Sequence, residues 1–165
     1  MGLPNKFVRF DIQSLVIQET EAFLHHVGCT QGVEALVLWA GTVDEGIARI
    51  GQVFVPEQRG YRTPQGHYLV VDPASTARIR EACLDLGLLP LVQVHSHPQE
   101  AFHSARDDRY PILKRVGCLS IVVPHFARSP MGQLTGCSVN ELEPGGHWRE
   151  WTTTEIRHRL QILRG

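Results

Sequence analysis

The stretch Leu91-Val92-Gln93-Val94-His95-Ser96-His97-Pro98 combines an apolar strand pattern with two histidines at its end. Side chains two positions apart on a strand point to the same face of the sheet, so His95 and His97 can both turn a ring nitrogen toward one ion. Zinc binds imidazole nitrogen at about 2.0–2.1 Å. We therefore expect a metal site where this strand ends.

The polar segment after Pro98 offers a third ligand. It contains Ser104-Ala105-Arg106-Asp107-Asp108, and Asp107 can return a carboxylate to the strand end. Three protein ligands leave one position for water, as in catalytic zinc sites, whereas structural sites are usually closed by cysteines. No cysteine lies near this motif, which favours catalysis. Ser104 and Asp107 also have the spacing of a capping box at the start of a short helix.

Length and composition predict one domain over residues 1–165. The 165 residues are 42% hydrophobic, enough for one core, and a net charge of -1 indicates neither a nucleic-acid nor a membrane partner. No apolar run reaches the roughly 18 residues that span a bilayer. The four cysteines are widely spaced, and residues 1–6 lack the apolar core of a secretion signal, so we expect reduced thiols in a cytoplasmic protein.

Hydrophobic periodicity predicts alternating strands and helices. Predicted helices cover 15–26, ended by Gly28, then 73–87, a short one from Ser104, and a C-terminal one from about Thr154. Predicted strands cover 35–40, 47–55, 68–71, 89–95, 118–123, 139–142 and 148–152, the first two joined by a turn at 44–46. This order predicts an α/β fold, a mixed sheet flanked by helices, with the histidines at the C-terminal end of a central strand.

Taken in order, these motifs resemble the signature of the JAMM metalloproteases, also called the MPN+ or JAB1/MPN/Mov34 family. That signature is a Glu, then His-x-His, then Ser-x-x-Asp, and the matching residues here are Glu34 before an apolar strand, His95 and His97, and Ser104 with Asp107. The compact chain resembles the bacterial and archaeal members. The resemblance implies a JAB/MPN-like fold with cytidine-deaminase-like layering.

The loop between the second histidine and the serine departs from the family pattern. Residues 98–103 leave six positions there, one fewer than the commoner pattern. A shifted register would restore the usual distance and make Asp108 the ligand, but it would place Ala105 where the family has serine. We prefer Asp107 with Ser104 and keep Asp108 as the alternative.

The resemblance also implies a role for each residue. His95, His97 and Asp107 would hold zinc, Glu34 would take a proton from the attacking water and pass it to the leaving amine, and Ser104 would donate a hydrogen bond to the oxyanion. The implied substrate is a ubiquitin-like modifier cut after its C-terminal Gly, in deconjugation or precursor maturation, alongside E1- and E2-like enzymes.

Other interpretations stay open at this point. Glu34 alone could be a polar residue before a buried strand. His103 is close enough to be a substitute ligand or a residue that supports a ligand, but most of the nine histidines must be surface residues, so we leave it outside the site. A non-catalytic MPN-type scaffold, or a zinc peptidase acting on small peptides or sulfur-carrier conjugates, is the alternative function. Segments 43–47 and 126–132 are the expected walls of the substrate channel, and the oligomeric state is left open.

Overall fold

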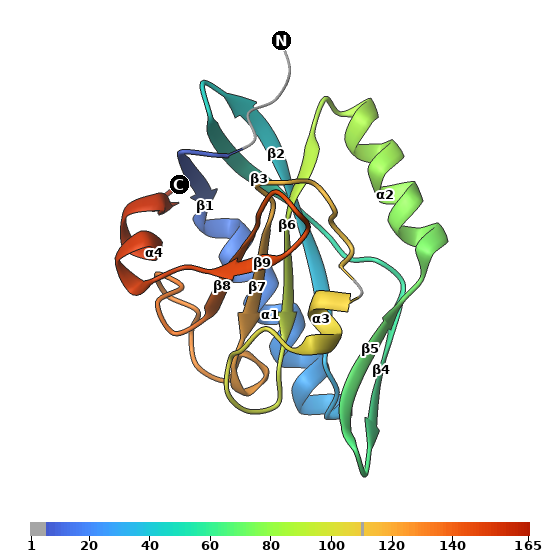
Figure 1. Ribbon diagram of the computed structural model, residues 1–165. Helices are drawn as coiled ribbons and strands as arrows, with labels where there is room; N and C mark the ends of the chain where they lie inside the picture. The colour runs from blue at the N-terminus through green and yellow to red at the C-terminus, as the bar shows by residue number, and fades with distance from the viewer. Residues whose placement is uncertain (1–5, 110) are drawn as a thin grey trace.

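A mixed eight-stranded sheet runs through the protein (Figure 1). The structure, a computed structural model, describes residues 6–109 and 111–165, so most of the segment assessed for a secretion signal lies outside the described residues. The strands of this sheet are β1 (Arg9–Gln13), β2 (Leu36–Asp44), β3 (Ile47–Phe54), β6 (Leu89–Ser96), β7 (Leu119–Val123), β8 (Ser138–Leu142), β9 (Trp148–Glu150) and β10 (Leu160–Leu163). Their order is β10-β1-β3-β2-β6-β7-β8-β9.

Strand β6, which carries the histidines, lies in the middle of this sheet. It pairs antiparallel with β2 and parallel with β7, so that His95 lies between Leu36 and Val122. The predicted hairpin of β2 and β3 is present, and its turn has positive φ at Glu45 and Gly46, the conformation that two-residue hairpin turns favour. The predicted α/β class, a mixed sheet flanked by helices, is confirmed.

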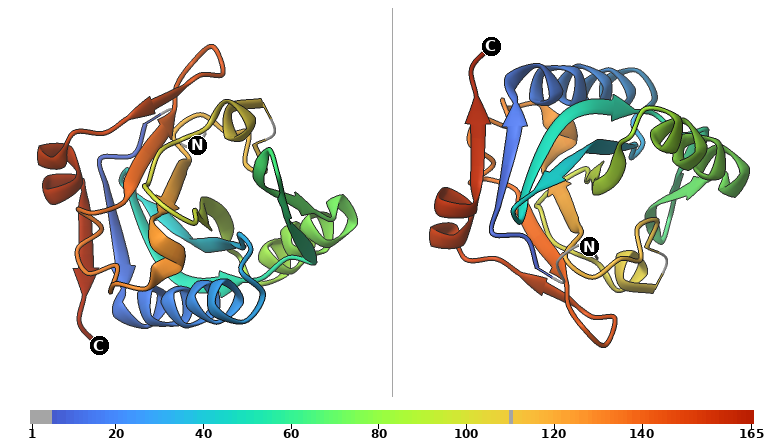
Figure 2. Two further views of the ribbon diagram at one scale, coloured as in Figure 1. Left: turned by 90° about the horizontal axis from the view of Figure 1, so that it is seen from below. Right: turned by 90° about the horizontal axis from the view of Figure 1, so that it is seen from above.

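Helices cover both faces of the sheet, so side chains on both faces of β2 are buried. Val37 and Trp39 pack in the core beside α1 (Ser14–Gln31), whereas Leu36 and Leu38 pack beside α2 (Pro73–Asp85) on the other face. Figure 2 shows the two helices on opposite sides of the curved sheet. None of the described helices is long and apolar enough to cross a membrane.

The predicted strand at 68–71 does not join this sheet. It belongs to β5 (Gly66–Val71), which among the described residues pairs only with β4 (Gln58–Thr63), in a separate two-stranded sheet. Strand β4 was not predicted, because its residues are mostly polar. The Gln58 side chain bonds both backbone groups of Leu36, at 2.6 and 2.7 Å, and this contact places the hairpin over the start of β2.

Two helix ends differ from the prediction. Gly28 lies inside α1, which continues to Gln31 and ends at Gly32 in the left-handed conformation that favours glycine. At the C-terminus, α4 (Thr153–Arg159) is capped by Thr152 and is followed by β10 rather than by more helix. Strands β1 and β10 were not predicted, and they pair with each other in parallel.

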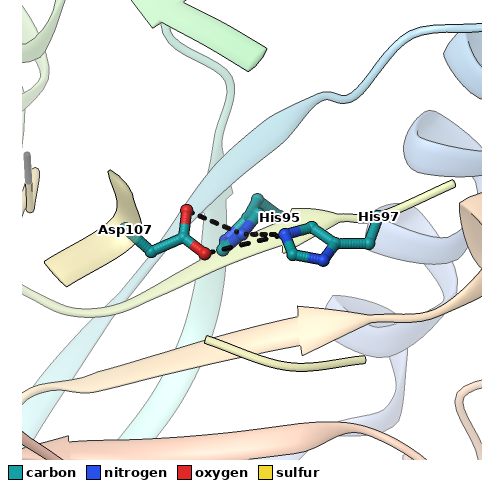
Figure 3. A group of neighbouring side chains, drawn as sticks. All are labelled: His95, His97 and Asp107. Carbon is teal, nitrogen blue, oxygen red and sulfur yellow. Dashed lines mark hydrogen bonds and ion pairs between the residues drawn. The ribbon is translucent and has the colours of Figure 1, made fainter. Parts of the chain in front are cut away.

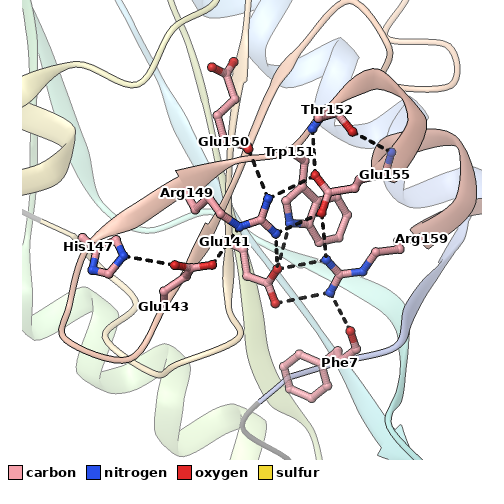
Figure 4. Close-up of polar contacts among 10 residues, drawn as sticks. All are labelled: Phe7, Glu141, Glu143, His147, Arg149, Glu150, Trp151, Thr152, Glu155 and Arg159. Atoms are coloured by element: carbon pink, nitrogen blue, oxygen red, sulfur yellow. Dashed lines mark hydrogen bonds and ion pairs between the residues drawn. The ribbon is translucent and has the colours of Figure 1, made fainter.

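A buried ion-pair network fastens β8, β9 and α4 together (Figure 4). The Glu141 carboxylate is 3% exposed and accepts hydrogen bonds from Arg159 and from the indole N–H of Trp151. Arg149 bridges to Glu155 of α4 at 3.0 Å. A buried carboxylate is tolerated only when it is paired in this way, so the network fixes this edge of the sheet.

Candidate active site

His95, His97 and Asp107 converge at the end of β6 (Figure 3). The two Nε2 atoms lie 3.2 Å apart, and the Asp107 carboxylate oxygens lie 3.2 Å from Nε2 of His95 and 3.6 Å from Nε2 of His97. Asp107 comes from α3 (Ala105–Arg109), which lies beside the strand end. These ligand-type atoms form a group that could hold a metal ion.

The distances fit a tetrahedral ion. Ligand atoms about 2.0–2.1 Å from a tetrahedral centre are separated by roughly 3.3–3.4 Å. The two Nε2 atoms are 3.2 Å apart, and each lies near one Asp107 oxygen, Oδ1 at 3.2 Å from His95 and Oδ2 at 3.6 Å from His97, so all three separations are close to that value. The histidines are 4% and 5% exposed, and their Nε2 atoms lie side by side away from bulk water, an arrangement that a cation would stabilise.

The backbone around His97 holds its side chain in place. The N–H of His97 donates to Val123 of β7 at 2.9 Å, and its carbonyl accepts the N–H of Phe126 at 2.9 Å. Phe126 lies in a turn in which 125–127 all have φ near +50°, a left-handed conformation that costs energy for residues other than glycine. The Phe126 side chain packs directly on Gly28 of α1, which explains why that helix position carries no side chain.

Glu34 lies beside the histidines because Ser96 ties the two strands together. Ser96 is fully buried, its N–H donates to Ala35 at 3.0 Å, and its hydroxyl accepts the Ala35 N–H at 3.1 Å. Burial raises the pKa of Glu34, and the nearby His97 and His95 partly offset that rise. The sequence interpretation assigned Ser96 no role, although its place between the two histidines was the available signal.

Ser104 and Asp107 form the predicted capping box. The Ser104 N–H donates to the Asp107 carboxylate at 2.7 Å, and the Asp107 N–H donates to the Ser104 hydroxyl at 3.1 Å. Burial alone would raise the pKa of Asp107, but the hydrogen bonds from His95 and His97 outweigh it and hold that pKa below its usual range. Asp107 is therefore ionised at neutral pH, as a metal ligand must be.

Asp108, the alternative ligand, faces elsewhere. Its carboxylate accepts a hydrogen bond from His103 at 2.9 Å, and 56% of the side chain is exposed. The side chain of His103 is buried, and it lies outside the metal-ligand group. Its second ring nitrogen is 3.1 Å from the Ser120 hydroxyl. Burial lowers the pKa of His103, with partial compensation from Asp107 and Asp108.

A cavity of about 880 Å³ opens onto these residues. Glu34, Ser104 and the three ligand-type side chains line it, together with all of β5 and the segment 97–100. The expected walls, 43–47 and 126–132, do not line it, so that prediction is wrong. The reason is the β4–β5 hairpin, which the sequence interpretation did not separate from the main sheet and which forms the wall opposite β6.

Comparison with known proteins assigns the family. Residues 18–131 match the family described as prokaryotic homologs of the JAB domain. The chain belongs to the prokaryotic JAB family. A curated JAB relative, the probable metalloprotease of Sinorhizobium fredii (strain NBRC 101917 / NGR234), is 35% identical over 146 residues, covering 88% of this chain and 89% of the relative. The predicted resemblance and the metalloprotease class are confirmed.

Solved structures share the JAB-like fold of this chain. A solution structure from Desulfitobacterium hafniense superposes with a TM-score of 0.63 at 16% identity, covering 94% of this chain and 92% of that one. A second, from Salinibacter ruber, gives 0.57 at 15% identity over 93% and 91%. Because more than nine tenths of this chain is covered, the likeness in fold extends beyond residue 131.

Proposed function

We propose that this JAB protein is a zinc-dependent isopeptidase or peptidase that hydrolyses the bond after the C-terminal Gly of a ubiquitin-like modifier. The observation that carries the proposal is the tetrahedral spacing of three ligand-type side chains next to a buried carboxylate, Glu34, in one cavity. A non-catalytic scaffold has no use for a complete ligand set.

In this proposal His95, His97 and Asp107 hold the zinc ion. Two imidazoles and one carboxylate are a donor set of catalytic zinc, which keeps one position open. When bound, the ion supplies a Lewis acid that makes water acidic near neutral pH and polarises the scissile carbonyl. The four described cysteines lie elsewhere and form no disulfide.

Glu34 moves the proton in this reaction. Its carboxylate accepts a proton from the attacking water while the new C–O bond forms, and it returns that proton to the amine nitrogen when the C–N bond breaks. Among the described residues, none donates a hydrogen bond to this carboxylate, so both oxygens are available. Its raised pKa favours the first of these steps, acceptance of the proton from water.

Ser104 stabilises the oxyanion. Its hydroxyl oxygen already accepts the Asp107 N–H, which leaves the hydroxyl proton available to donate into the cavity that Ser104 lines. A well-placed donor of this kind contributes about 2.7–4 kcal/mol in other enzymes. The capping box and the catalytic role are therefore compatible.

The hairpin β4–β5 suits an extended substrate tail. All six residues of β5 line the cavity, although alternate side chains of a strand point to opposite faces, so the strand meets the cavity edge-on. No strand in the described part of the chain pairs with that edge, because β5 pairs there with β4 alone. A peptide tail could add to it as a third strand, with main-chain hydrogen bonds supplying affinity.

Partners and compartment follow from the same proposal. We propose E1- and E2-like enzymes as functional partners and no nucleic-acid or membrane partner. A cytoplasmic location agrees with four cysteines that are all free thiols in the structure.

The test measures zinc content and cleavage together. Wild type and His97→Ala are purified without chelators, with the exposed His26→Ala as matched control, and zinc is quantified in each. Cleavage of a ubiquitin-like Gly-Gly fusion is compared in wild type, Glu34→Gln and the exposed Glu19→Gln control. A short synthetic peptide and a sulfur-carrier conjugate serve as competing substrates.

We expect one zinc per wild-type chain, loss of zinc in His97→Ala alone, and loss of about 10²–10⁴-fold in kcat with zinc retained in Glu34→Gln. A wild type without zinc would refute the metalloprotease proposal. Cleavage of only the small peptide or the sulfur-carrier conjugate would refute the modifier while leaving the enzyme class in place.

A further inference from the structure

Asp107, the third ligand, lies on α3, a helix too short to be stable by itself. Helix α3 has five residues and no buried side chain, and isolated helices of that length are unstable in water. His95 and His97, in contrast, stand at the end of a strand with neighbours on both sides. Any metal affinity therefore depends on what orders residues 98–109, which carry Asp107, and residues 111–113, which follow them.

A polar row across the sheet provides that order. Gln93 of β6, Ser120 of β7 and Asn140 of β8 lie in register, and all three are buried. On one side of α3, the Gln93 side-chain carbonyl accepts the N–H groups of Ile112 and Leu113, both at 3.0 Å. The row thus holds the end of the segment that follows α3.

His103 holds the other side. Its imidazole is 6% exposed although it belongs to a loop, and it lies 3.1 Å from the Ser120 hydroxyl and 2.9 Å from the Asp108 carboxylate. The ring also packs against Trp148, with centroids 5.2 Å apart. The His103 side chain therefore connects Ser120 of β7 to α3, the helix that carries Asp107.

Donors and acceptors around His103 can be assigned in order, from Gln93 through Ser120 and His103 to Asp108. Gln93 donates its amide N–H to the Ser120 oxygen at 3.1 Å, so the Ser120 hydroxyl proton is free to donate to Nε2 of His103. Asp108 can only accept, so Nδ1–H of His103 donates to it. Each of the donors named here has an acceptor. A buried hydrogen-bond network that is satisfied in this way is rigid.

We infer that His103 is a positioning residue for Asp107, acting through Asp108 and Ser120 to keep α3 within ligand distance of the two histidines. The inference rests on the proposed zinc site and adds a residue that the ligand set does not contain. His103 does not bind the metal itself, because both of its ring nitrogens are already used.

The test separates the hydrogen bonds of His103 from its packing. In His103→Phe the ring still packs on Trp148 but both nitrogens are lost. The matched control is His147→Phe, which removes an exposed imidazole bonded to a carboxylate at 3.0 Å in the turn between β8 and β9, away from α3. Zinc dissociation constants are measured by competition with a chelator, and amide hydrogen exchange of α3 is followed in the metal-free proteins.

We expect His103→Phe to raise the zinc dissociation constant about tenfold, at the lower end of the range for outer-shell partners, and to speed α3 exchange. His147→Phe should stay within twofold. Asp108→Ala removes one of the two bonds of His103, and Ser120→Ala removes the other together with the acceptor of Gln93. Each should raise the constant about threefold, so they decide the question if His103→Phe does not fold.

Zinc constants within twofold of wild type in all three variants would overturn the inference. If the wild type binds no zinc, the proposed function fails. The positioning role of His103 is then judged by hydrogen exchange alone. Faster α3 exchange in His103→Phe than in His147→Phe supports it, and equal exchange refutes it.

Discussion

Replacing Gly28 with alanine should destabilise the protein, although alanine is the better helix former. An ideal Cβ at this position of α1 would lie 2.3 Å from Cβ and 2.6 Å from Cγ of Phe126. Ordinary contacts between such atoms are 3.4–4 Å. Phe126 is 6% exposed and is held by its backbone hydrogen bond to His97, so it has little room to retreat.

Two opposing terms set the size of the effect. Alanine gains about 0.8–1 kcal/mol over glycine inside a helix. Overpacking of a filled core costs about 1–3 kcal/mol, and a displacement of more than 1 Å belongs at the upper end. The net loss is therefore about 1–2 kcal/mol, which lowers Tm by roughly 2–8 °C in a protein of this size.

The assay is thermal unfolding of the metal-free protein, with Gly136→Ala as matched control, because a Cβ at Gly136 meets nothing within 4 Å. In a Phe126→Gly background the added methyl group meets open space, so Gly28→Ala should there stabilise by up to about 1 kcal/mol. A Tm at or above wild type for Gly28→Ala, or an equal penalty in both backgrounds, would refute the reasoning. Zinc affinity should fall with the single variant, because the turn of Phe126 holds His97.

Three further predictions concern polar groups. Because burial raises the pKa of Glu34, its stabilising contribution is complete below its ordinary pKa and is lost as pH rises, so Glu34→Gln should raise the Tm of the metal-free protein more at pH 8 than at pH 4. Arg149 holds the pKa of Glu155 at about 2, so that stability is present above pH 4.5 and lost as pH falls toward 2, and Glu155→Gln should lower Tm at pH 6 but hardly at pH 2. Thr20→Val leaves the indole N–H of Trp39 buried without its 2.8 Å acceptor and should cost about 1–3 kcal/mol in urea unfolding, whereas Thr20→Ser, which keeps the hydroxyl, should cost less.

Local patterns predicted much of the site. The strand ending in His95 and His97 followed from an apolar run with two imidazoles at period 2, and the capping box of Ser104 and Asp107 followed from a three-residue spacing. Both depend on neighbours in the sequence. Glu34 could be assigned only through the family resemblance, because the bond that holds its neighbour Ala35 to Ser96 joins two strands that are far apart in the sequence.

The missed features depend on distant contacts. Gly28 was interpreted as a helix end because glycine is common there, but it is needed for contact with Phe126. Strands β4 and β10 are short or polar, and their formation depends on pairing rather than on propensity. His103 resembled a surface histidine, since nothing in its loop indicates a buried acceptor on β7.

The parallel pair of β1 and β10 has a consequence for how the chain reaches its native state. The bond from Arg159 to the carbonyl of Phe7 joins residues 152 positions apart. Closing so long a loop costs conformational entropy before the contact can stabilise the chain. Such non-local pairing slows folding. Until β10 docks, β1 presents an unpaired edge, the kind of surface through which chains aggregate. Yield on refolding should therefore depend on protein concentration far more than native stability does.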